Sequence, residues 1–324
     1  MKLLIPGGAG YIGSHMVKYA QEHDHEVVVL DDFSTGHDWA VEDCEILAVN
    51  LLDEYRLSQL LKGRYFDGVI HFAAKSLVGE SIKKPDFYYR NNVVGTLNLV
   101  NEMLKNDLNN LVFSSTAAIF GHPVSDKIAE DHLKQPINPY GKSKLMVENI
   151  LQDICSTKAF NVLCLRYFNA AGAHESGEIG EAHDPETHLI PNILKAAISK
   201  EINLKVFGDD YPTPDGTCVR DYVHVSDLAQ AHLLGIEYMQ KNRGFSAFNL
   251  GNGDGFSVYE VINACQKTTN TKIPIQINGR REGDPAVLVA DNKHAIDGLN
   301  WHPKHSCLNS IINSAWRWHN RETC

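Results

Sequence analysis

The chain has 324 residues, which is long enough to bury a large core and to form two lobes. Its content of 43% hydrophobic and 22% charged residues is ordinary for a soluble globular protein. The formal net charge of −10 argues against general nucleic-acid binding, for which a basic surface is expected. We therefore expect no nucleic-acid partner. A local cluster of arginines could still bind an anionic small molecule.

Secretion and membrane insertion have no support in the sequence. Residues 1–5 hold one cation and an apolar run that is too short for a signal peptide. No later stretch reaches the roughly eighteen apolar residues of a transmembrane helix. The seven cysteines are odd in number, widely spaced and without a C-x-x-C pair, as in a reduced intracellular protein. The sequence therefore predicts a cytoplasmic location and no membrane partner.

Short apolar runs alternate with amphipathic stretches through the first half of the chain. Strands are expected at residues 2–5, 26–31, 45–49, 68–72, 110–115 and 161–167. Helices are expected at residues 12–22, 54–62, 86–104 and 140–155. Strands this apolar are typical of a parallel sheet that is covered by helices on both faces. The pattern predicts an α/β fold with a doubly wound, Rossmann-type parallel sheet.

The second half has a different texture. Residues 171–187 are rich in glycine, glutamate and histidine, and residues 208–216 hold two prolines and two glycines, so both segments are expected to be loops. Ser257 and Glu260 have the spacing of a capping box, which predicts a helix to about residue 268. We predict a Rossmann domain over residues 1–168, to which segments of about 218–252 return. A smaller mixed α/β lobe is predicted over residues 169–324.

A glycine-rich loop follows the first expected strand. Gly7, Gly10 and Gly13 form G-x-x-G-x-x-G at the start of the first helix, where glycines let the backbone approach a pyrophosphate. Asp31 and Asp32 end the second strand, where an acid can bind the adenosine ribose hydroxyls. This context predicts NAD as the cofactor, whereas the alternative is a plain tight turn followed by surface acids.

A tyrosine and a lysine lie at the start of a later helix. Asn138 is a good helix cap and Pro139 suits the first helical position, so Tyr140 and Lys144 fall at i and i+4 on one face. A nearby ammonium and the positive nicotinamide of NAD are expected to lower the phenol's pKa from about 10. Such a tyrosine can remove a proton from a sugar hydroxyl while hydride leaves the carbon. The pair therefore indicates an acid/base catalyst.

Histidine clusters give no metal prediction. His183 and His188, like the pairs at 23/25 and 302/305, lack the H-E-x-x-H arrangement and a matching third ligand. Solvated or core histidines are the expected outcome, and no metal site is predicted.

The glycine loop, the S-S-T at residues 114–116 and the Y-x-x-x-K at residues 140–144 resemble the motifs of the extended short-chain dehydrogenase/reductase family. Longer stretches resemble its UDP-glucose 4-epimerase branch, nearly from end to end: residues 71–81, 88–96, 138–148, 165–181, 206–229 and 279–291. The resemblance implies an isomerase of carbohydrate metabolism that retains NAD, acts on a UDP-sugar and forms a homodimer. It implies oxidation at sugar C4 and hydride return to the opposite face, which interconverts UDP-glucose and UDP-galactose in galactose metabolism.

The resemblance also implies roles for individual residues. Tyr140 would be the acid/base, Lys144 its electrostatic partner, and Thr116 the hydroxyl that bonds the reacting sugar oxygen. The NAD site would also include Gly7, Gly10, Tyr11, Ile12, Gly13, Asp31, Asp32, Phe33, Ser34, Thr35, Asn50, Leu51, Phe72, Ala73, Ala74, Lys75, Asn91, Ser114 and Tyr167. The UDP-sugar would contact Asn169, His188, Leu189, Lys205, Phe207, Arg220, Tyr222, Arg281, Asp284 and Leu288. Two guanidiniums suit a diphosphate, and a carboxylate suits the uridine ribose.

Four positions depart from the family pattern. Pro6 replaces a threonine before the first glycine, and Asn50 replaces an aspartate that contacts adenine. Lys75 lies one place earlier than a lysine that some members direct at the cofactor. Leu288 occupies the position that governs sugar size, where other members have tyrosine or cysteine. Leucine is intermediate, so tolerance of N-acetylated sugars stays open.

Three alternative functions fit parts of the sequence. A C4 epimerase of UDP-N-acetylglucosamine or of UDP-xylose/arabinose is compatible with Leu288. A nucleotide-sugar 4,6-dehydratase would carry an Asp-Glu pair after Thr116, where this chain has Ala117 and Ala118. A non-catalytic NAD-binding protein would have lost catalytic residues that are all present here. The sequence favours C4 epimerisation.

Overall fold

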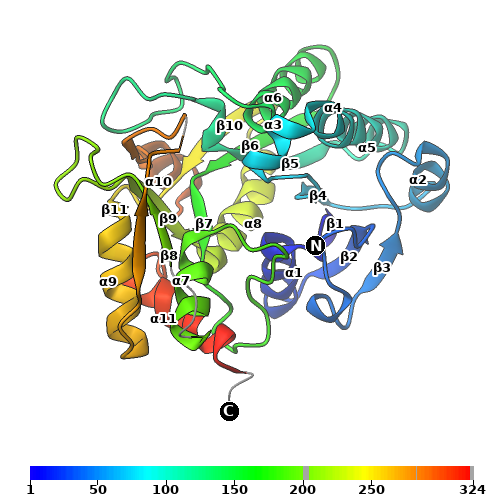
Figure 1. Cartoon of the computed structure of the whole chain (residues 1–324). Coiled ribbons are helices and arrows are strands. Elements are labelled where there is room, and N and C mark those ends of the chain that lie inside the picture. Colours follow the sequence, from blue (N-terminus) through cyan, green and yellow to red (C-terminus); the bar gives the residue numbers. More distant parts are fainter. Residues whose placement is uncertain (200–203, 282, 322–324) are drawn as a thin grey trace.

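Seven parallel strands form the central sheet in the computed structural model, which describes residues 1–199, 204–281 and 283–321 (Figure 1). The strand order is β10-β6-β5-β4-β1-β2-β3. The strands are β1 Lys2–Pro6, β2 Glu26–Asp31, β3 Glu45–Ala48, β4 Gly68–His71, β5 Asn110–Thr116, β6 Asn161–Tyr167 and β10 Phe245–Leu250. This architecture confirms the predicted doubly wound α/β fold.

Both faces of the sheet are buried, as the continuous apolar runs require. In β1, Leu3 and Ile5 pack into one hydrophobic cluster and Leu4 into another, because successive side chains point to opposite faces. Helices α1 (Tyr11–Glu22) and α8 (Val225–Lys241) cover the first face. Helices α2 (Glu54–Leu61), α5 (Gly95–Lys105) and α6 (Pro139–Thr157) cover the second.

The helix expected at residues 86–104 is interrupted. It consists of α4 (Pro85–Tyr89), the π-helical turn η2 (Arg90–Val94) and α5, and it follows the short helix α3 (Val78–Lys83). The wider turn contains Asn92, whose side chain accepts a hydrogen bond from the Lys75 amide at 2.9 Å and donates one to the Ser143 hydroxyl at 3.0 Å. The prediction of one regular helix over residues 86–104 was wrong, because the π turn accompanies contacts between Asn92 and residues far away in the chain. Single π-helical turns are frequent near functional sites.

The second half builds a smaller lobe with two sheets. Strands β11 (Gly255–Ser257), β9 (Val219–His224) and β13 (Val287–Leu288) form one sheet, with β7 (Asn169–Ala171) paired to β9. Strands β8 (Leu204–Phe207) and β12 (Ile275–Asn278) form the other. Helices α7 (Leu189–Ser199), α9 (Val258–Thr269) and α11 (Leu308–His319) pack over them, and α10 (Lys293–Leu299) contacts β10.

Local signals and chain returns agree with this arrangement. The expected capping box is present at α9: the Ser257 hydroxyl accepts from the Glu260 amide at 3.1 Å, and Glu260 Oε2 accepts from the Ser257 amide at 2.8 Å. Between residues 218 and 252, α8 and β10 join the large sheet and its layer, whereas β9 belongs to the smaller lobe. The domain boundary after residue 168 remains a prediction.

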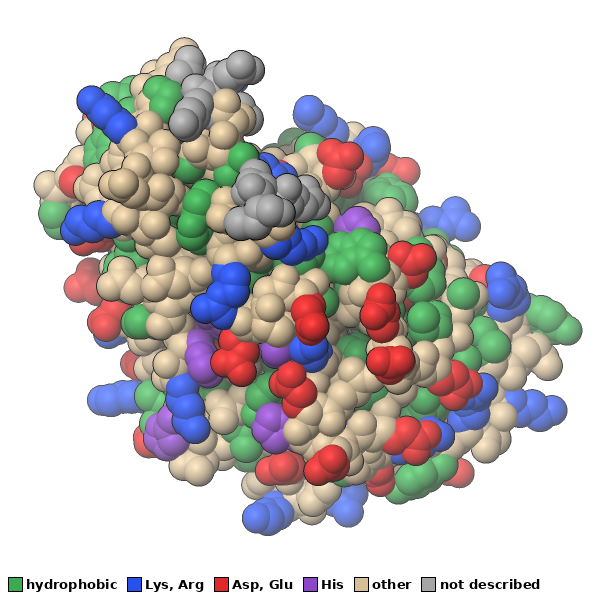
Figure 2. Space-filling model, turned by 90° about the horizontal axis from the view of Figure 1, so that it is seen from below, with side chains coloured by type: hydrophobic (Ala, Val, Ile, Leu, Met, Phe, Trp, Pro, Cys, Tyr) green, Lys and Arg blue, Asp and Glu red, His purple; other side chains and the backbone are tan. Residues whose placement is uncertain are grey.

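The carboxyl ends of the parallel strands meet at one edge of the sheet. Strand order reverses between β1 and β4, and ligands of doubly wound folds bind in the crevice at such a switch point. The fold therefore brings together the loops after β1, β2, β4, β5 and β6. Among the described residues, no helix is long and apolar enough to cross a membrane. Acidic and basic side chains are interspersed on the face seen in Figure 2.

Candidate active site

A cleft of about 590 Å³ lies at the switch point between β1 and β4. Most of the residues predicted to hold the cofactor line it. These are Gly7, Gly10, Asp31, Asp32, Ser34, Thr35, Asn50, Leu51, Phe72, Ala73, Ala74, Lys75 and Asn91. Three further residues line the cleft that were not predicted from the sequence: Leu30, Gly36 and Val49. The fold thus gathers the segments that follow β1, β2, β3 and β4, together with Asn91 of the turn Arg90–Val94, around one cavity.

The glycine loop needs its glycines for steric reasons. Gly7 has φ +80°, and a Cβ there would lie 2.3 Å from the backbone nitrogen of Ala73. A Cβ on Gly13 would lie 2.1 Å from the Gly7 carbonyl oxygen. A Cβ on Gly10 would meet only that same oxygen at 3.5 Å, so the backbone at Gly10 is open toward the cleft. This cradle fits a pyrophosphate that approaches the start of α1.

Asp31 and Asp32 have different environments. Both Asp31 oxygens accept backbone hydrogen bonds, Oδ2 from Ala9 and Oδ1 from Phe33, each at 2.9 Å. Burial raises the pKa of Asp31. Burial acts in the same direction on Asp32, but hydrogen bonds from Ser34 and Asn50 prevail and lower its pKa. Asp32 is therefore the acid better placed to meet a ligand, and Asp31 holds the glycine loop.

Two departures from the family pattern join this acidic edge of the cleft. The Asn50 amide nitrogen donates to Asp32 Oδ2, and Asn50 Oδ1 accepts from the Leu52 amide at 2.8 Å. The Lys75 ammonium donates to the Ser34 hydroxyl at 2.8 Å. Gly36 packs here too, because a Cβ on it would lie 2.8 Å from the backbone of Ala9. A glycine five residues after the first acid was the signal that could have identified Gly36.

The predicted catalytic residues converge beyond the cleft, at the end of β5. The Asn138 side chain caps α6 by accepting from the Gly141 amide at 2.9 Å, with Pro139 at the first helical position. The phenol of Tyr140 lies beside the Thr116 hydroxyl. The Lys144 ammonium donates to the carbonyl oxygen of Ser114 at 2.7 Å and lies 4.7 Å from the centre of the Phe113 ring. The helix face and the strand end therefore form one constellation.

The pKa values of this constellation differ from the sequence-based prediction. Burial raises the pKa of Tyr140, and the neighbouring Thr116 hydroxyl only partly opposes it. Burial also lowers the pKa of Lys144 to about 7. The predicted lowering of the phenol's pKa was wrong for the groups of the chain itself, because the burial of Tyr140 prevails and Lys144 does not contribute to the shift. Lowering by the positive charge of a nicotinamide stays a prediction.

Buried polar groups behind the strands support these residues. The Ser115 hydroxyl donates to Glu148 Oε1, and the Arg166 guanidinium binds Glu148 with its Nη2 2.7 Å from Oε2. The Ser114 hydroxyl lies 3.2 Å from His232 Nε2, and the His232 ring packs against Phe72, with centroids 4.6 Å apart. Burial lowers the pKa of His232 to about 4. No pattern in the sequence predicted these contacts, because they join residues that lie far apart in the chain.

Several predicted substrate residues lie together on β9, on β13 and around the loop before β13. Arg220 Nη2 lies 3.5 Å from Asp284 Oδ1, and its Nη1 donates to the Pro285 carbonyl at 2.9 Å. The Arg281 guanidinium stacks 4.0 Å from the centre of the Phe207 ring. Leu288 pairs with Arg220 in the β9–β13 ladder. Two cations, an acid and an aromatic ring are therefore available to a charged nucleotide.

The other predicted substrate residues belong to neighbouring elements. Asn169 pairs with Tyr222 between β7 and β9, and Tyr222 is buried. Leu189, the first residue of α7, packs into the same hydrophobic cluster as Tyr222. Lys205 is exposed on β8, on the same strand face as Phe207. Of the predicted cofactor residues that do not line the cleft, Tyr167 pairs with Thr116 between β6 and β5, and its side chain lies near Ser114.

His188 lies in a cluster that the sequence analysis did not foresee. Its ring contacts the Glu181 carboxylate, and the metal-ligating atoms of Glu181, His183, Glu186 and His188 lie within 4.8 Å of one another. The expectation that His183 and His188 lack a further ligand was wrong, because the loop before α7 folds back and brings Glu181 and Glu186 beside them.

The glycine cradle, the acid after β2 and the tyrosine, lysine and threonine at the end of β5 define a dinucleotide-binding enzyme of the short-chain dehydrogenase/reductase type. The family model described as "NAD dependent epimerase/dehydratase family" matches residues 3–251. The chain belongs to this family.

Known relatives cover nearly the whole chain. The chain is 47% identical to a UDP-glucose 4-epimerase of Halalkalibacterium halodurans over 319 residues. The matched region covers 98% of this chain and 96% of that protein. The crystal structure of a Brucella ovis UDP-glucose 4-epimerase in complex with NAD has a TM-score of 0.94 and 43% identity, and covers 97% of both chains. A UDP-Glc/GlcNAc 4-epimerase from Campylobacter jejuni has a TM-score of 0.86 and 41% identity over 100% of this chain and 99% of its own.

Proposed function

We propose that this protein interconverts UDP-glucose and UDP-galactose by inverting C4 of the sugar with a retained NAD. One observation carries the proposal: Tyr140, Thr116 and Lys144 converge at the end of β5, beside a glycine-lined cleft at the switch point of the sheet. The relatives described above carry the same function in their names. Catalysis and cofactor binding would therefore use neighbouring strand ends.

The residues of the cleft fit NAD. The open backbone at Gly10 and the steric need for Gly7 and Gly13 suit a pyrophosphate at the start of α1. Asp32 keeps a low pKa at the rim and suits the vicinal hydroxyls of an adenosine ribose. When bound, NAD supplies a hydride acceptor that returns the hydride within the same catalytic cycle. Lys144 and the neighbouring Ser114 would hold the nicotinamide end.

The chain's own residues would move and hold the proton. Tyr140 removes the proton from the C4 hydroxyl of the sugar, and the Thr116 hydroxyl donates a hydrogen bond that steadies the reacting oxygen. The resulting 4-keto sugar turns over, and Tyr140 returns the proton after reduction from the opposite face. Arg220 and Arg281 would bind the diphosphate, and Asp284 the uridine ribose, so that the nucleotide stays fixed while the sugar turns.

The residues after Thr116 favour inversion over dehydration. Ala117 and Ala118 begin the 3₁₀ turn η3 (Ala117–Ile119), so neither an acid nor a base follows the threonine to expel water. The choice of sugar depends on the neighbourhood of Leu288. A second candidate function is epimerisation of UDP-N-acetylglucosamine. Leu288 is compatible with it, because leucine is intermediate in size between the tyrosine and the cysteine of other members, and a similar structure is that of a UDP-Glc/GlcNAc 4-epimerase.

Two measurements test the proposed function. The purified protein, denatured without added cofactor, should release about one NAD per chain, and it should convert UDP-galactose into UDP-glucose. Tyr140→Phe should lose at least about 10²-fold in kcat, because general acid–base catalysis contributes about 10²–10⁴-fold. Tyr55→Phe is the matched control, since Tyr55 is 75% exposed on α2. Near-normal turnover by Tyr140→Phe would remove this tyrosine from the mechanism.

A homodimer is the proposed assembly. Six apolar side chains are exposed on helices that pack side by side: Val78 42%, Ile82 63%, Phe87 40%, Val94 43%, Leu97 36% and Met146 45%. They belong to α3, α4, η2, α5 and α6. Grouped exposed apolar side chains are typical of protein–protein contacts, and a second copy of the chain would bury them.

Sedimentation equilibrium tests the assembly. Wild type should have twice the chain mass, and Ile82→Asp should shift it toward monomer. Val124→Asp is the control, because Val124 is 80% exposed outside these helices. A monomeric wild type would refute the homodimer.

The free state of the six described cysteines supports a cytoplasmic location, and the proposed reaction supports a role in galactose metabolism.

A further inference from the structure

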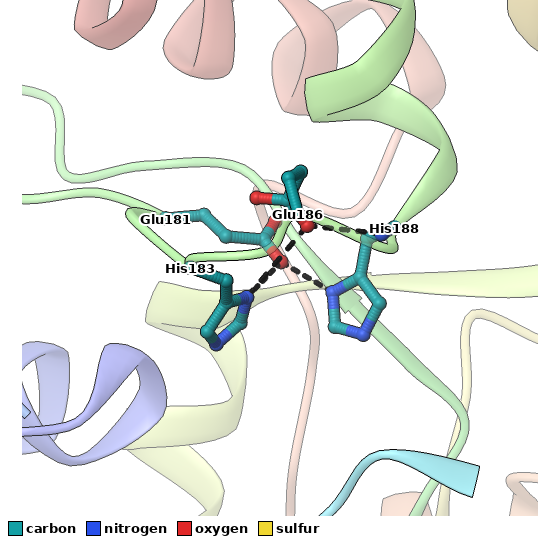
Figure 3. Close-up of side chains that lie close together, drawn as sticks. All are labelled: Glu181, His183, Glu186 and His188. Carbon is teal, nitrogen blue, oxygen red and sulfur yellow. Dashed lines mark hydrogen bonds and ion pairs between the residues drawn. The ribbon is translucent and has the colours of Figure 1, made fainter. Parts of the chain in front are cut away.

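The loop between β7 and α7 concentrates four metal-ligating side chains within eight residues. Glu181, His183, Glu186 and His188 converge in Figure 3, with both imidazole Nδ1 atoms turned toward the carboxylates. The loop has no regular secondary structure over residues 172–188. Long loops without secondary structure inside compact proteins are commonly functional. We propose that these four side chains bind a divalent transition-metal ion such as Zn²⁺, which pins this loop to the two lobes.

The distances between the donor atoms suit such an ion. His183 Nδ1 lies 3.0 Å from Glu181 Oε1 and 3.8 Å from Glu186 Oε1. Zinc bonds of about 2.0–2.2 Å in tetrahedral geometry place ligand atoms about 3.3–3.6 Å apart. The observed separations bracket this range, and all four donor atoms lie within 4.8 Å of one another. Small side-chain rotations would therefore complete a four-ligand site.

Charge and an unsatisfied oxygen atom also point to a bound cation. The Glu181 and Glu186 side chains are each only 4% exposed, and their ion pairs among the described residues are with histidines. Buried carboxylates need a compensating positive charge. Glu186 Oε2 is buried without a hydrogen-bond partner among the described residues, and His183 Nδ1 contacts the two carboxylates. One divalent ion at the point where these atoms converge would neutralise both acids.

The surrounding structure holds the ligands in place. The Trp318 indole nitrogen donates to the Glu181 carbonyl at 3.0 Å, and His37 Nε2 lies 2.9 Å from the Ala182 carbonyl. The backbone amide of His188 donates to Glu186 Oε1 at 2.9 Å. Such outer contacts orient metal ligands. The His188 side chain is 50% exposed, which leaves a path by which an ion can enter.

The position of the site suggests what the ion does. The Tyr11 hydroxyl of the glycine loop donates to the Gly172 carbonyl at 2.6 Å, and the Tyr11 ring lies edge-on to His183, with centroids 6.0 Å apart. His188 directly precedes α7. The ion would therefore fix the spacing between the cofactor-side loop and the first turn of α7. This is a structural role that does not depend on the proposed catalytic activity.

Cobalt and zinc titrations of the holoenzyme test the site. After treatment with EDTA and its removal, wild type should bind one Co²⁺ per chain with visible absorption bands of tetrahedral coordination, and Zn²⁺ should displace it. His183→Asn and His188→Asn should each weaken binding at least tenfold. His302→Asn is the control, because His302 is exposed outside the cluster. Circular dichroism would verify that the variants are folded.

Two results would overturn the proposal. One is a wild type that takes up no stoichiometric Co²⁺ or Zn²⁺, in which case two protonated imidazoles balance the carboxylates instead. The other is uptake that His183→Asn, His188→Asn and His302→Asn leave equally strong, which would place the metal elsewhere. The experiment measures metal binding, so its result can be interpreted even if the protein shows no epimerase activity.

Discussion

Lys144 donates a hydrogen bond to the carbonyl oxygen of Ser114 at 2.7 Å, and this contact ties the catalytic helix α6 to the end of strand β5. The donor is buried, and its pKa falls to about 7 because of burial. The lysine therefore serves as an internal brace as well as a charge. Removal of its side chain should affect both the position of Tyr140 and the polarity around it.

Lys144→Met tests this brace. Methionine keeps the length and burial of the side chain but cannot donate to the Ser114 carbonyl, so kcat for UDP-galactose should fall by about 10²-fold or more. Lys142→Met is the control on the same helix, since Lys142 is exposed. Steady-state kinetics with UDP-galactose would measure both variants. Equal kcat values for the two variants would show that the Lys144 ammonium is dispensable.

Leu288 should control the size of the sugar. It packs beside a cluster that contains Ala117, the residue next to Thr116, so a larger side chain at 288 would fill space near the reacting sugar. Leu288→Tyr should lower the activity ratio of UDP-N-acetylglucosamine to UDP-glucose about 10- to 100-fold. Leu288→Met, of similar volume, should leave the ratio unchanged. Paired rate measurements decide the matter, and an unaltered ratio in Leu288→Tyr would assign sugar size to other residues.

Gly13→Ala should abolish the retention of NAD while the fold survives. The new Cβ would lie 2.1 Å from the Gly7 carbonyl oxygen, so the glycine loop must shift at the point where a pyrophosphate is expected. Gly79→Ala is the control, because a Cβ there meets nothing within 4 Å. Nucleotide absorbance after denaturation reports the NAD content. A Gly13→Ala protein with one NAD per chain would contradict this account of the loop.

His232 should make the protein sensitive to acid. Burial lowers its folded-state pKa to about 4, whereas an unfolded histidine titrates near 6.5. The stabilising contribution is therefore present above about pH 6.5 and is lost as the pH falls toward about 4. Between pH 7.5 and pH 4.5, wild type should lose about 2–3 kcal/mol of unfolding free energy relative to His232→Gln.

Urea unfolding at the two pH values measures this difference. His302→Gln is the control, because His302 is exposed and lies outside the contacts of His232. A pH-independent difference between wild type and His232→Gln would mean that the imidazole has the same pKa in the folded and the unfolded protein. The geometry argues for the neutral form, since His232 Nδ1 lies 2.7 Å from the Leu228 carbonyl and Nε2 faces the Ser114 hydroxyl.

Local signals in the sequence predicted much of this molecule. Short continuous apolar runs predicted the strands, because successive side chains point to opposite faces of a sheet that helices cover on both sides. Asn138 and Pro139 predicted the start of α6, and with it the common face of Tyr140 and Lys144, because caps and helical periodicity act over a few residues. The motifs and the family resemblance then indicated NAD and a UDP-sugar.

Tertiary structure alone decided the environment of those residues. The sequence determined that Tyr140 and Lys144 share a helix face, but only the approach of β5 directed Lys144 at the Ser114 carbonyl and buried Tyr140, which raised the pKa of its phenol. Likewise, no pattern in the sequence grouped His183 and His188 with Glu181 and Glu186. The fold of the loop before α7 brings the four side chains together. Propensities and caps are short-range, whereas burial and electrostatics depend on segments that meet only when the chain has folded.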